Sequence, residues 1–155
     1  MFDNLLKTAN IEEIIKEFSK NLNTDSQESF FNKKAPKFTE IILSVIIPLR
    51  DQNLLFNPEG KPLETINVEE FLKWCDLVSL KTLYFTLKQS NVANTLLRTK
   101  FKSSQAINYK KIDISLLENY VKENAINLDD ELYDFPIRNY NIHMGIGSVI
   151  KNVMK

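Results

Sequence analysis

The sequence predicts an all-α domain of about six to eight helices, packed around a central apolar helix at 27–50. Apolar residues recur at helical spacing in several segments, and no segment alternates convincingly with the period of two that strands show. The composition, with 43% apolar residues, three glycines and five prolines, argues against a β-rich or disordered chain. A chain of 155 residues forms a single domain, here 1–155, that buries about 68–70% of its unfolded surface.

The central helix is predicted by a run that becomes apolar on every side between Ile41 and Leu49 and then stops at a charged pair. A helix that is apolar all round is either the centre of a bundle or a membrane span. This run is too short for a bilayer, which takes about 20 apolar residues, so we expect a buried helix. Pro36 lacks a backbone N–H, and its ring collides with the carbonyl four residues earlier. We therefore expect either a kink at Pro36 or two helices, at 27–34 and 37–50.

The remaining helices are predicted from apolar stripes and from polar residues that cap their first turns. We expect N-caps, three of them with the glutamate of a capping box, at Asn10, Asn67, Ser79 and Ser115. The predicted helices cover 11–22, 67–75, 79–87, 91–97, 115–121 and 141–154. Leu116 and Met144 are expected on the buried faces of the last two. Two prolines and a glycine predict a loop at 57–62.

Catalytic, cofactor and metal sites are not expected. Cys75 is the only cysteine and lies on an apolar stripe, where a buried, inert thiol is usual. With His143 as the only histidine, a zinc site has too few nitrogen and sulfur ligands, so a hydrolase-like use of Cys75 or His143 is the least favoured alternative. The glycines near 145 do not complete a phosphate loop. Because no secretion signal and no long apolar run occur, we expect a cytoplasmic location.

Charge is uneven along the chain, although 20 basic residues balance 20 acidic ones. The basic block contains no acidic residue and consists of Lys81, Lys88, Arg98, Lys100, Lys102, Lys110 and Lys111. The acidic block follows it and consists of Asp113, Glu118, Glu123, Asp129, Asp130, Glu131 and Asp134, against Lys122 alone.

These blocks allow two interpretations. In the first, which their adjacency favours, they fold against each other and neutralise one another. In the second they are binding surfaces. Cations mixed with hydroxyls and an aromatic residue at 98–105 are typical of phosphate contacts, so the basic block would bind nucleic acid or an acidic partner. The acidic residues from 129 to 134 would then bind a basic partner or a divalent cation. Their spacing does not match a calcium-binding EF-hand loop, so a solvated helix face or loop is favoured over a metal site.

An aromatic pair at Phe30-Phe31 is followed by a small residue, an apolar helix ending in Leu49-Arg50-Asp51, and Asn53-Leu54-Leu55. This order resembles the all-alpha domain of type IV secretion coupling proteins of the TraD, TraG and DotL kind. The segments 2–5, 11–15 and 66–72 are also similar to that domain, so the likeness spans roughly 2–90. Phe31 stands where the family usually has tryptophan, and Pro36 lies in a stretch normally free of proline.

The resemblance implies a fragment of a larger, hexameric ATPase at the bacterial inner membrane, separated from its nucleotide-binding domain. It implies that this part lies on the cytoplasmic side and recognises the secretion substrate. That substrate would be a DNA–relaxase complex, a secreted protein or an adaptor. The alternative is an unrelated small helical adaptor or chaperone that binds a partner helix in an apolar groove.

Overall fold

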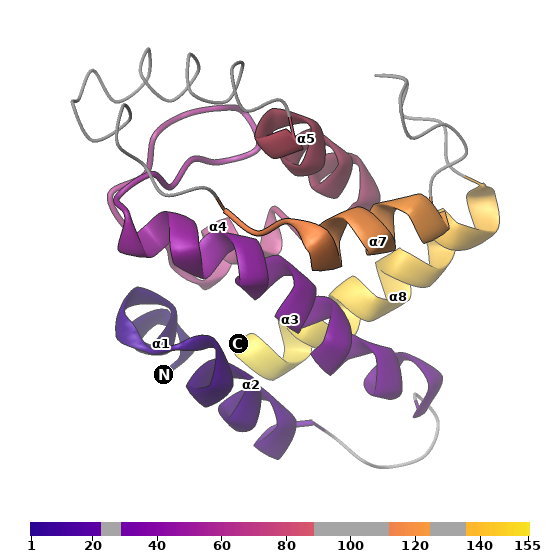
Figure 1. The fold of residues 1–155 in the computed structure, drawn as a ribbon. Coiled ribbons are helices and arrows are strands. Elements are labelled where there is room, and N and C mark those ends of the chain that lie inside the picture. Colours follow the sequence, from indigo (N-terminus) through magenta and orange to yellow (C-terminus); the bar gives the residue numbers. More distant parts are fainter. Residues whose placement is uncertain (23–28, 89–111, 125–135) are drawn as a thin grey trace.

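The computed structural model describes residues 1–22, 29–88, 112–124 and 136–155. Within these ranges the chain forms seven α-helices and no β-strand, which confirms the all-α prediction (Figure 1). The helices are α1 (Phe2–Thr8), α2 (Ile11–Lys20), α3 (Ser29–Asp51), α4 (Val68–Leu72), α5 (Leu77–Lys88), α7 (Ser115–Asn124) and α8 (Ile137–Met154). The helix predicted at 91–97 lies outside the described residues.

Helix α3 is the centre of the domain, as predicted. It packs most extensively against α8 and also contacts α2 and α7, while α5 packs on α7, and α4 contacts α8 and α1. In Figure 1, α3 runs through the middle, with α1 and α2 on one side and α5 and α7 on the other. Its apolar side chains that are at most 4% exposed are Ala35, Phe38, Ile41, Ile42, Leu43, Val45, Ile46, Ile47 and Leu49. Phe30, near the beginning of the helix, is 53% exposed and does not belong to this core.

Helix α3 is continuous, so the prediction of two separate helices is wrong, and Pro36 and Pro48 both lie inside it. A proline in a helix interior costs about 3 kcal/mol. Ala35 and Phe38, on either side of Pro36, are both buried. Packing of this kind supplies most of the stability of helices in proteins, and it offsets the loss of one backbone hydrogen bond. The alternative of a kink at Pro36 stays a prediction.

The predictions that depend on local sequence are largely confirmed. The side-chain oxygens of Asn10 and Asn67 each accept a 2.8 Å hydrogen bond from the backbone N–H three residues later. The predicted loop at 57–62 is a turn, closed by an isolated antiparallel bridge between Phe56 and Pro62. No helix in the described parts of the chain combines the length and the apolar character that crossing a membrane requires.

The predicted caps at Ser79 and Ser115 are wrong. Helix α5 begins earlier, at Leu77, and the Ser79 N–H donates to the Asp76 carboxylate at 2.7 Å. Ser115 is the first residue of α7, and both its N–H and its hydroxyl donate to Asp113. In each place a nearby upstream carboxylate accepts the hydrogen bonds of the first turn, because a charged oxygen is the stronger acceptor.

Two positions expected on buried faces are exposed. Leu116 on α7 is 47% exposed and Met144 on α8 is 61% exposed. The other predicted positions agree better, because Leu117 and Val121 on α7 and Val149 and Ile150 on α8 are buried as expected. Helix α8 also buries His143 and Ile146, which were not predicted. The predicted stripes are therefore right in their main positions and wrong at Leu116 and Met144.

Polar contacts attach the N-terminal helix to the rest of the domain. Arg50 at the end of α3 donates to the carbonyl of Leu6 at 2.9 Å and pairs with Asp51, also at 2.9 Å. Near the beginning of α1, the Asp3 carboxylate accepts the N–H of Val68, the first residue of α4, at 2.7 Å. Several of the residues that carry the family resemblance therefore have structural roles in this fold.

Candidate functional site

The structure describes only part of the two predicted charge blocks. Lys81 is fully buried, with its Nζ 5.7 Å from the centre of the Phe85 ring, so it does not present its charge on the surface. Lys88 is exposed, and its Nζ lies 5.2 Å from the centre of the Tyr84 ring. The other predicted binding residues lie outside the described residues: Arg98, Lys100, Lys102, Lys110, Lys111, Asp129, Asp130, Glu131 and Asp134.

Where both blocks are described, they approach each other. Glu118 of the acidic block accepts a hydrogen bond from Tyr84 at 3.1 Å and pairs with Lys122 at 3.3 Å. The pKa of Glu118 lies below its ordinary value because of Lys122 and Tyr84, and Lys88 of the basic block adds a weaker effect in the same direction. This part of the molecule agrees with mutual neutralisation, since α5 and α7 pack side by side.

A different cluster of basic residues surrounds a cavity of about 370 Å³ between α3, α7 and α8, which we call the basic pocket. Its lining residues are Lys33, Lys34, Lys37, Phe38, Tyr120, Glu123, Asn124, Asn139, Ile142, His143 and Ile146. The three lysines are exposed and lie on one side of α3, because residues three and four positions apart are neighbours on a helix. Glu123 is the only acidic residue of the lining.

The floor of the basic pocket is a cluster of three rings. The ring centres of Phe38, Tyr120 and His143 lie 5.3–5.4 Å apart in all three pairs, in tilted or edge-to-face orientations that aromatic rings prefer. Phe38 is 1% exposed and His143 is 4% exposed. The pocket therefore combines a buried aromatic and apolar base with a rim of exposed cations.

His143 uses both of its ring nitrogens. Nδ1 lies 2.7 Å from the backbone carbonyl of Asn139, which can only accept, so Nδ1 carries the hydrogen. Nε2 then accepts a hydrogen bond from the hydroxyl of Tyr120. Burial lowers the pKa of His143, and the charge of Lys34 lowers it further. Burial raises the pKa of the Tyr120 hydroxyl well above its ordinary value, so the pair is neutral near pH 7.

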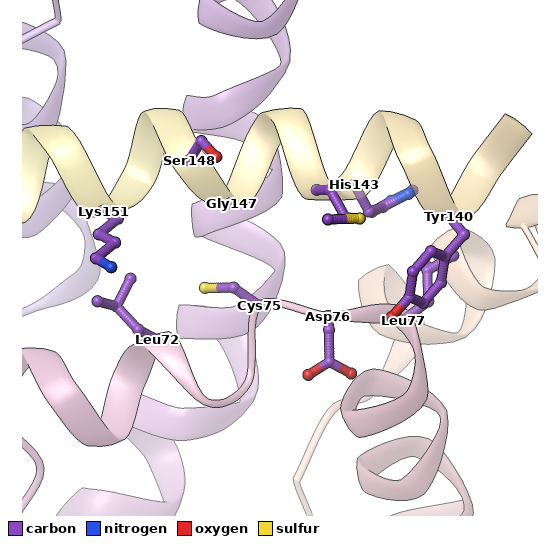
Figure 2. Close-up of a pocket in the computed structure, with 10 residues that line it drawn as sticks. Leu72, Cys75, Asp76, Leu77, Tyr140, His143, Gly147, Ser148 and Lys151 are labelled. Atoms are coloured by element: carbon purple, nitrogen blue, oxygen red, sulfur yellow. The ribbon is translucent and has the colours of Figure 1, made fainter.

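The other side of α8 borders a second cavity of about 280 Å³, which we call the outer groove (Figure 2). Its lining residues are Leu72, Cys75, Asp76, Leu77, Tyr140, His143, Met144, Gly147, Ser148 and Lys151. In Figure 2 the side chains of Lys151 and Leu72 lie at one end, and those of Tyr140 and Leu77 lie at the other. Asp76 points away from α8 and accepts hydrogen bonds from Ser79, so it does not add a free charge to this groove.

The outer groove brings Cys75 and His143 to one cavity but does not activate the thiol. Cys75 is buried, and this burial raises the pKa of its thiol far above the ordinary value. Its Sγ donates to the carbonyl of Phe71 at 3.7 Å, while the nitrogens of His143 bond to Asn139 and Tyr120. A nucleophilic pair needs a thiolate beside a free imidazole nitrogen, and this geometry offers neither. Among the described residues, no group of three or more His, Cys, Asp or Glu side chains is placed to hold a metal ion.

The sequence analysis did not identify the basic pocket. One signal was present: Lys33, Lys34 and Lys37 have helical spacing next to the apolar Phe38. That spacing by itself predicts only a polar side of the helix at 27–50. Nothing local shows that Tyr120 and His143, 23 residues apart, share a hydrogen bond.

No family model, curated protein or solved structure matches this chain. The resemblance to the all-alpha domain of coupling proteins therefore stays a prediction.

Proposed function

We propose that this domain recognises a partner protein by binding an acidic segment of it in the basic pocket. In the context that the sequence resemblance implies, the domain would be the substrate- or adaptor-recognition part of a type IV secretion coupling protein. The observation that carries the proposal is the combination of three exposed lysines with a buried aromatic floor in one cavity.

The size and chemistry of the basic pocket favour a small part of a polypeptide. A cavity of about 370 Å³ is near the lower end of the range of about 300–1,000 Å³ for ligand pockets. A carboxylate could approach Lys33, Lys34 and Lys37, while an adjacent apolar side chain would contact Phe38 and Ile142. The ammonium groups would attract the carboxylate, and the floor would bury apolar surface of the ligand. This burial matters because exposed ion pairs alone contribute little binding energy.

DNA fits this site less well than an acidic peptide. Duplex binding depends on many phosphate contacts along a groove or a helix face. Here the lysines gather around a single cavity, and Glu123 on the facing helix would repel a continuous polyanion. Of the two described residues of the predicted basic block, Lys81 is buried and only Lys88 is exposed, and Glu118 and Tyr84 lie close to Lys88. We therefore favour protein over nucleic acid as the partner.

The runner-up function is that of a helical adaptor that takes a partner helix into an apolar groove. The specific observation in its favour is the outer groove, where Tyr140 and Met144 are 44% and 61% exposed. Binding there would depend on apolar contact and would respond little to salt.

The two functions can be separated with a fluorescent peptide in which adjacent glutamates are flanked by leucine and phenylalanine. The combined variant Lys33→Glu, Lys34→Glu and Lys37→Glu should weaken its binding at least about tenfold, as expected when three attractive charge contacts become repulsive. The matched control reverses three exposed lysines of α1 and α2 with the same change in net charge, namely Lys7, Lys16 and Lys20. Anisotropy titrations measure both affinities.

Each alternative outcome has a distinct meaning. Equal weakening by both triple variants would show unspecific attraction and contradict the proposal. Preference for double-stranded DNA, with a steep loss of affinity as salt rises, would favour nucleic-acid recognition instead. Binding that survives both triple variants but is lost in Met144→Glu would favour the outer groove and the adaptor function.

A further inference from the structure

In the basic pocket, the direction of the hydrogen bond between Tyr120 and His143 decides whether the Tyr120 hydroxyl can donate to a ligand. Tyr120 lines the pocket, but its hydroxyl hydrogen is engaged with Nε2 of the neutral His143. Nδ1 cannot replace Nε2 as the acceptor, because Nδ1 donates to the carbonyl of Asn139. At neutral pH the hydroxyl therefore has no hydrogen to offer to a ligand.

Protonation of His143 reverses the direction of this hydrogen bond. A proton taken from solvent adds to Nε2, which becomes a donor and can only be satisfied by the hydroxyl oxygen of Tyr120. The O–H bond then turns about the C–O axis, and its hydrogen becomes available to another acceptor. One proton is taken up and no covalent bond between heavy atoms changes.

We infer that Tyr120 and His143 form a proton-operated donor, through which the basic pocket binds a carboxylate-bearing ligand more tightly when His143 is protonated. This inference rests on the proposed function, because the ligand is the acidic segment bound in that pocket. It adds a binding role for Tyr120 and makes recognition dependent on pH.

Titratable and charged groups of three neighbouring elements lie around His143. Helix α3 contributes Lys33, Lys34 and Lys37, and helix α7 contributes Glu123 along with the neutral Tyr120. On the side of the outer groove lie Cys75 and Asp76 from the segment between α4 and α5, with Lys151 from α8 itself, and the Asp76 carboxylate points away from α8. Without a ligand, burial and Lys34 disfavour the imidazolium. A bound carboxylate offsets the lysine charge and accepts the freed hydroxyl hydrogen, so ligand and proton favour each other's binding.

This linkage is reciprocal and can be measured from either side. The pKa of His143 should rise when the peptide binds, and the affinity for the peptide should rise as pH falls through that pKa. His143 is the only histidine, so its ring C–H resonance in an NMR titration reports this pKa without an assignment problem. The titration is done between about pH 5 and 7.5, because ordinary carboxyl groups titrate near 4.

The variant Tyr120→Phe separates a proton-operated donor from a merely structural residue. It keeps the ring that contacts Phe38 but removes the hydroxyl, so the readout is the ratio of its peptide affinities at pH 5 and pH 7.5, compared with the same ratio for the unaltered protein. At pH 5 the variant should lack the part of the affinity gain that the hydroxyl donor supplies, about tenfold for a hydrogen bond to a charged group. Circular dichroism checks its fold, and the titration of the unaltered protein is a test in itself.

Four results would overturn the inference. If the peptide binds but the pKa of His143 stays unchanged, the inference fails while the proposed function stands. An equal loss of affinity at both pH values in Tyr120→Phe would show a structural role only. An unchanged acid gain in that variant would refute the hydroxyl donor. If the peptide does not bind at any pH, the proposed function fails and the inference fails with it.

Discussion

The two sides of α8 border cavities of similar size that are lined by different kinds of side chain. The basic pocket, on the side of α3 and α7, has a closed aromatic floor and three lysines from a single helix. The outer groove, on the side of α4 and α5, has exposed apolar side chains and a buried thiol. His143 lines both cavities, but its two hydrogen bonds are to Asn139 and to Tyr120, which lines the basic pocket. The same helix thus separates a cavity with a buried aromatic floor from one lined by exposed apolar side chains.

The two glycines of α8 differ in the space that surrounds them. A Cβ atom at Gly145 would lie 2.5 Å from the ring of Phe31 on α3, so the absence of a side chain permits close packing there. A Cβ atom at Gly147 would meet nothing within 4 Å, and Gly147 lines the outer groove. The ring of Phe31 fills the space beside Gly145, whereas the space beside Gly147 is open.

The largest expected effect is on stability, when one apolar side chain is truncated in each cavity. Phe38→Ala should lower the free energy of unfolding by about 3–5 kcal/mol, because it removes a buried ring and leaves a cavity beneath the lysines. Met144→Ala should change it by no more than about 0.5 kcal/mol, because this side chain is mostly exposed. Urea unfolding followed by circular dichroism measures both. A similar decrease in the free energy of unfolding in both variants would contradict the conclusion that only the basic pocket has a packed floor.

A smaller effect is expected from alanine at the two glycines. Gly145→Ala should be destabilising, because overpacking against Phe31 costs about 1–3 kcal/mol while alanine regains up to about 1 kcal/mol of helix propensity. Gly147→Ala is the matched control and should stabilise the domain by about 0.5–1 kcal/mol, since nothing obstructs the methyl group. The melting temperatures should therefore move in opposite directions. A rise in both would mean that Phe31 moves aside without cost.

The sequence allowed the prediction of features that depend on a few consecutive residues. The apolar run from Ile41 to Leu49 is buried because it is apolar on all sides, whatever packs against it. The caps at Asn10 and Asn67 are local hydrogen bonds. At Ser79 a local pattern is misleading, because the Asp76 carboxylate, three residues upstream, accepts the hydrogen bond from the Ser79 N–H.

Predictions that depend on contacts between distant segments were less accurate. Met144 has the right spacing for a buried stripe, but the position of α3 and α7 decides that the neighbouring His143 is buried instead. The basic pocket combines side chains from three helices that begin at Ser29, Ser115 and Ile137. Helical periodicity gives the face of each helix but not its neighbour, so this cavity could not be derived from the sequence.

The smallest expected effect is on the titration of His143, and it distinguishes the lysines of the two cavities. Lys34→Gln should raise the pKa of His143 by removing a repulsive charge from the basic pocket. Lys151→Gln, at the outer groove, should leave that pKa unchanged, because no effect of Lys151 on it is found. Because the folded protein holds this pKa below the unfolded value of about 6.5, neutral His143 supports stability above that pH. The support is lost as pH falls through the folded-state pKa, and Lys34→Gln should reduce the loss. NMR titration of the single histidine measures the shift, and an equal rise in both variants would show that Lys34 has no special proximity to His143.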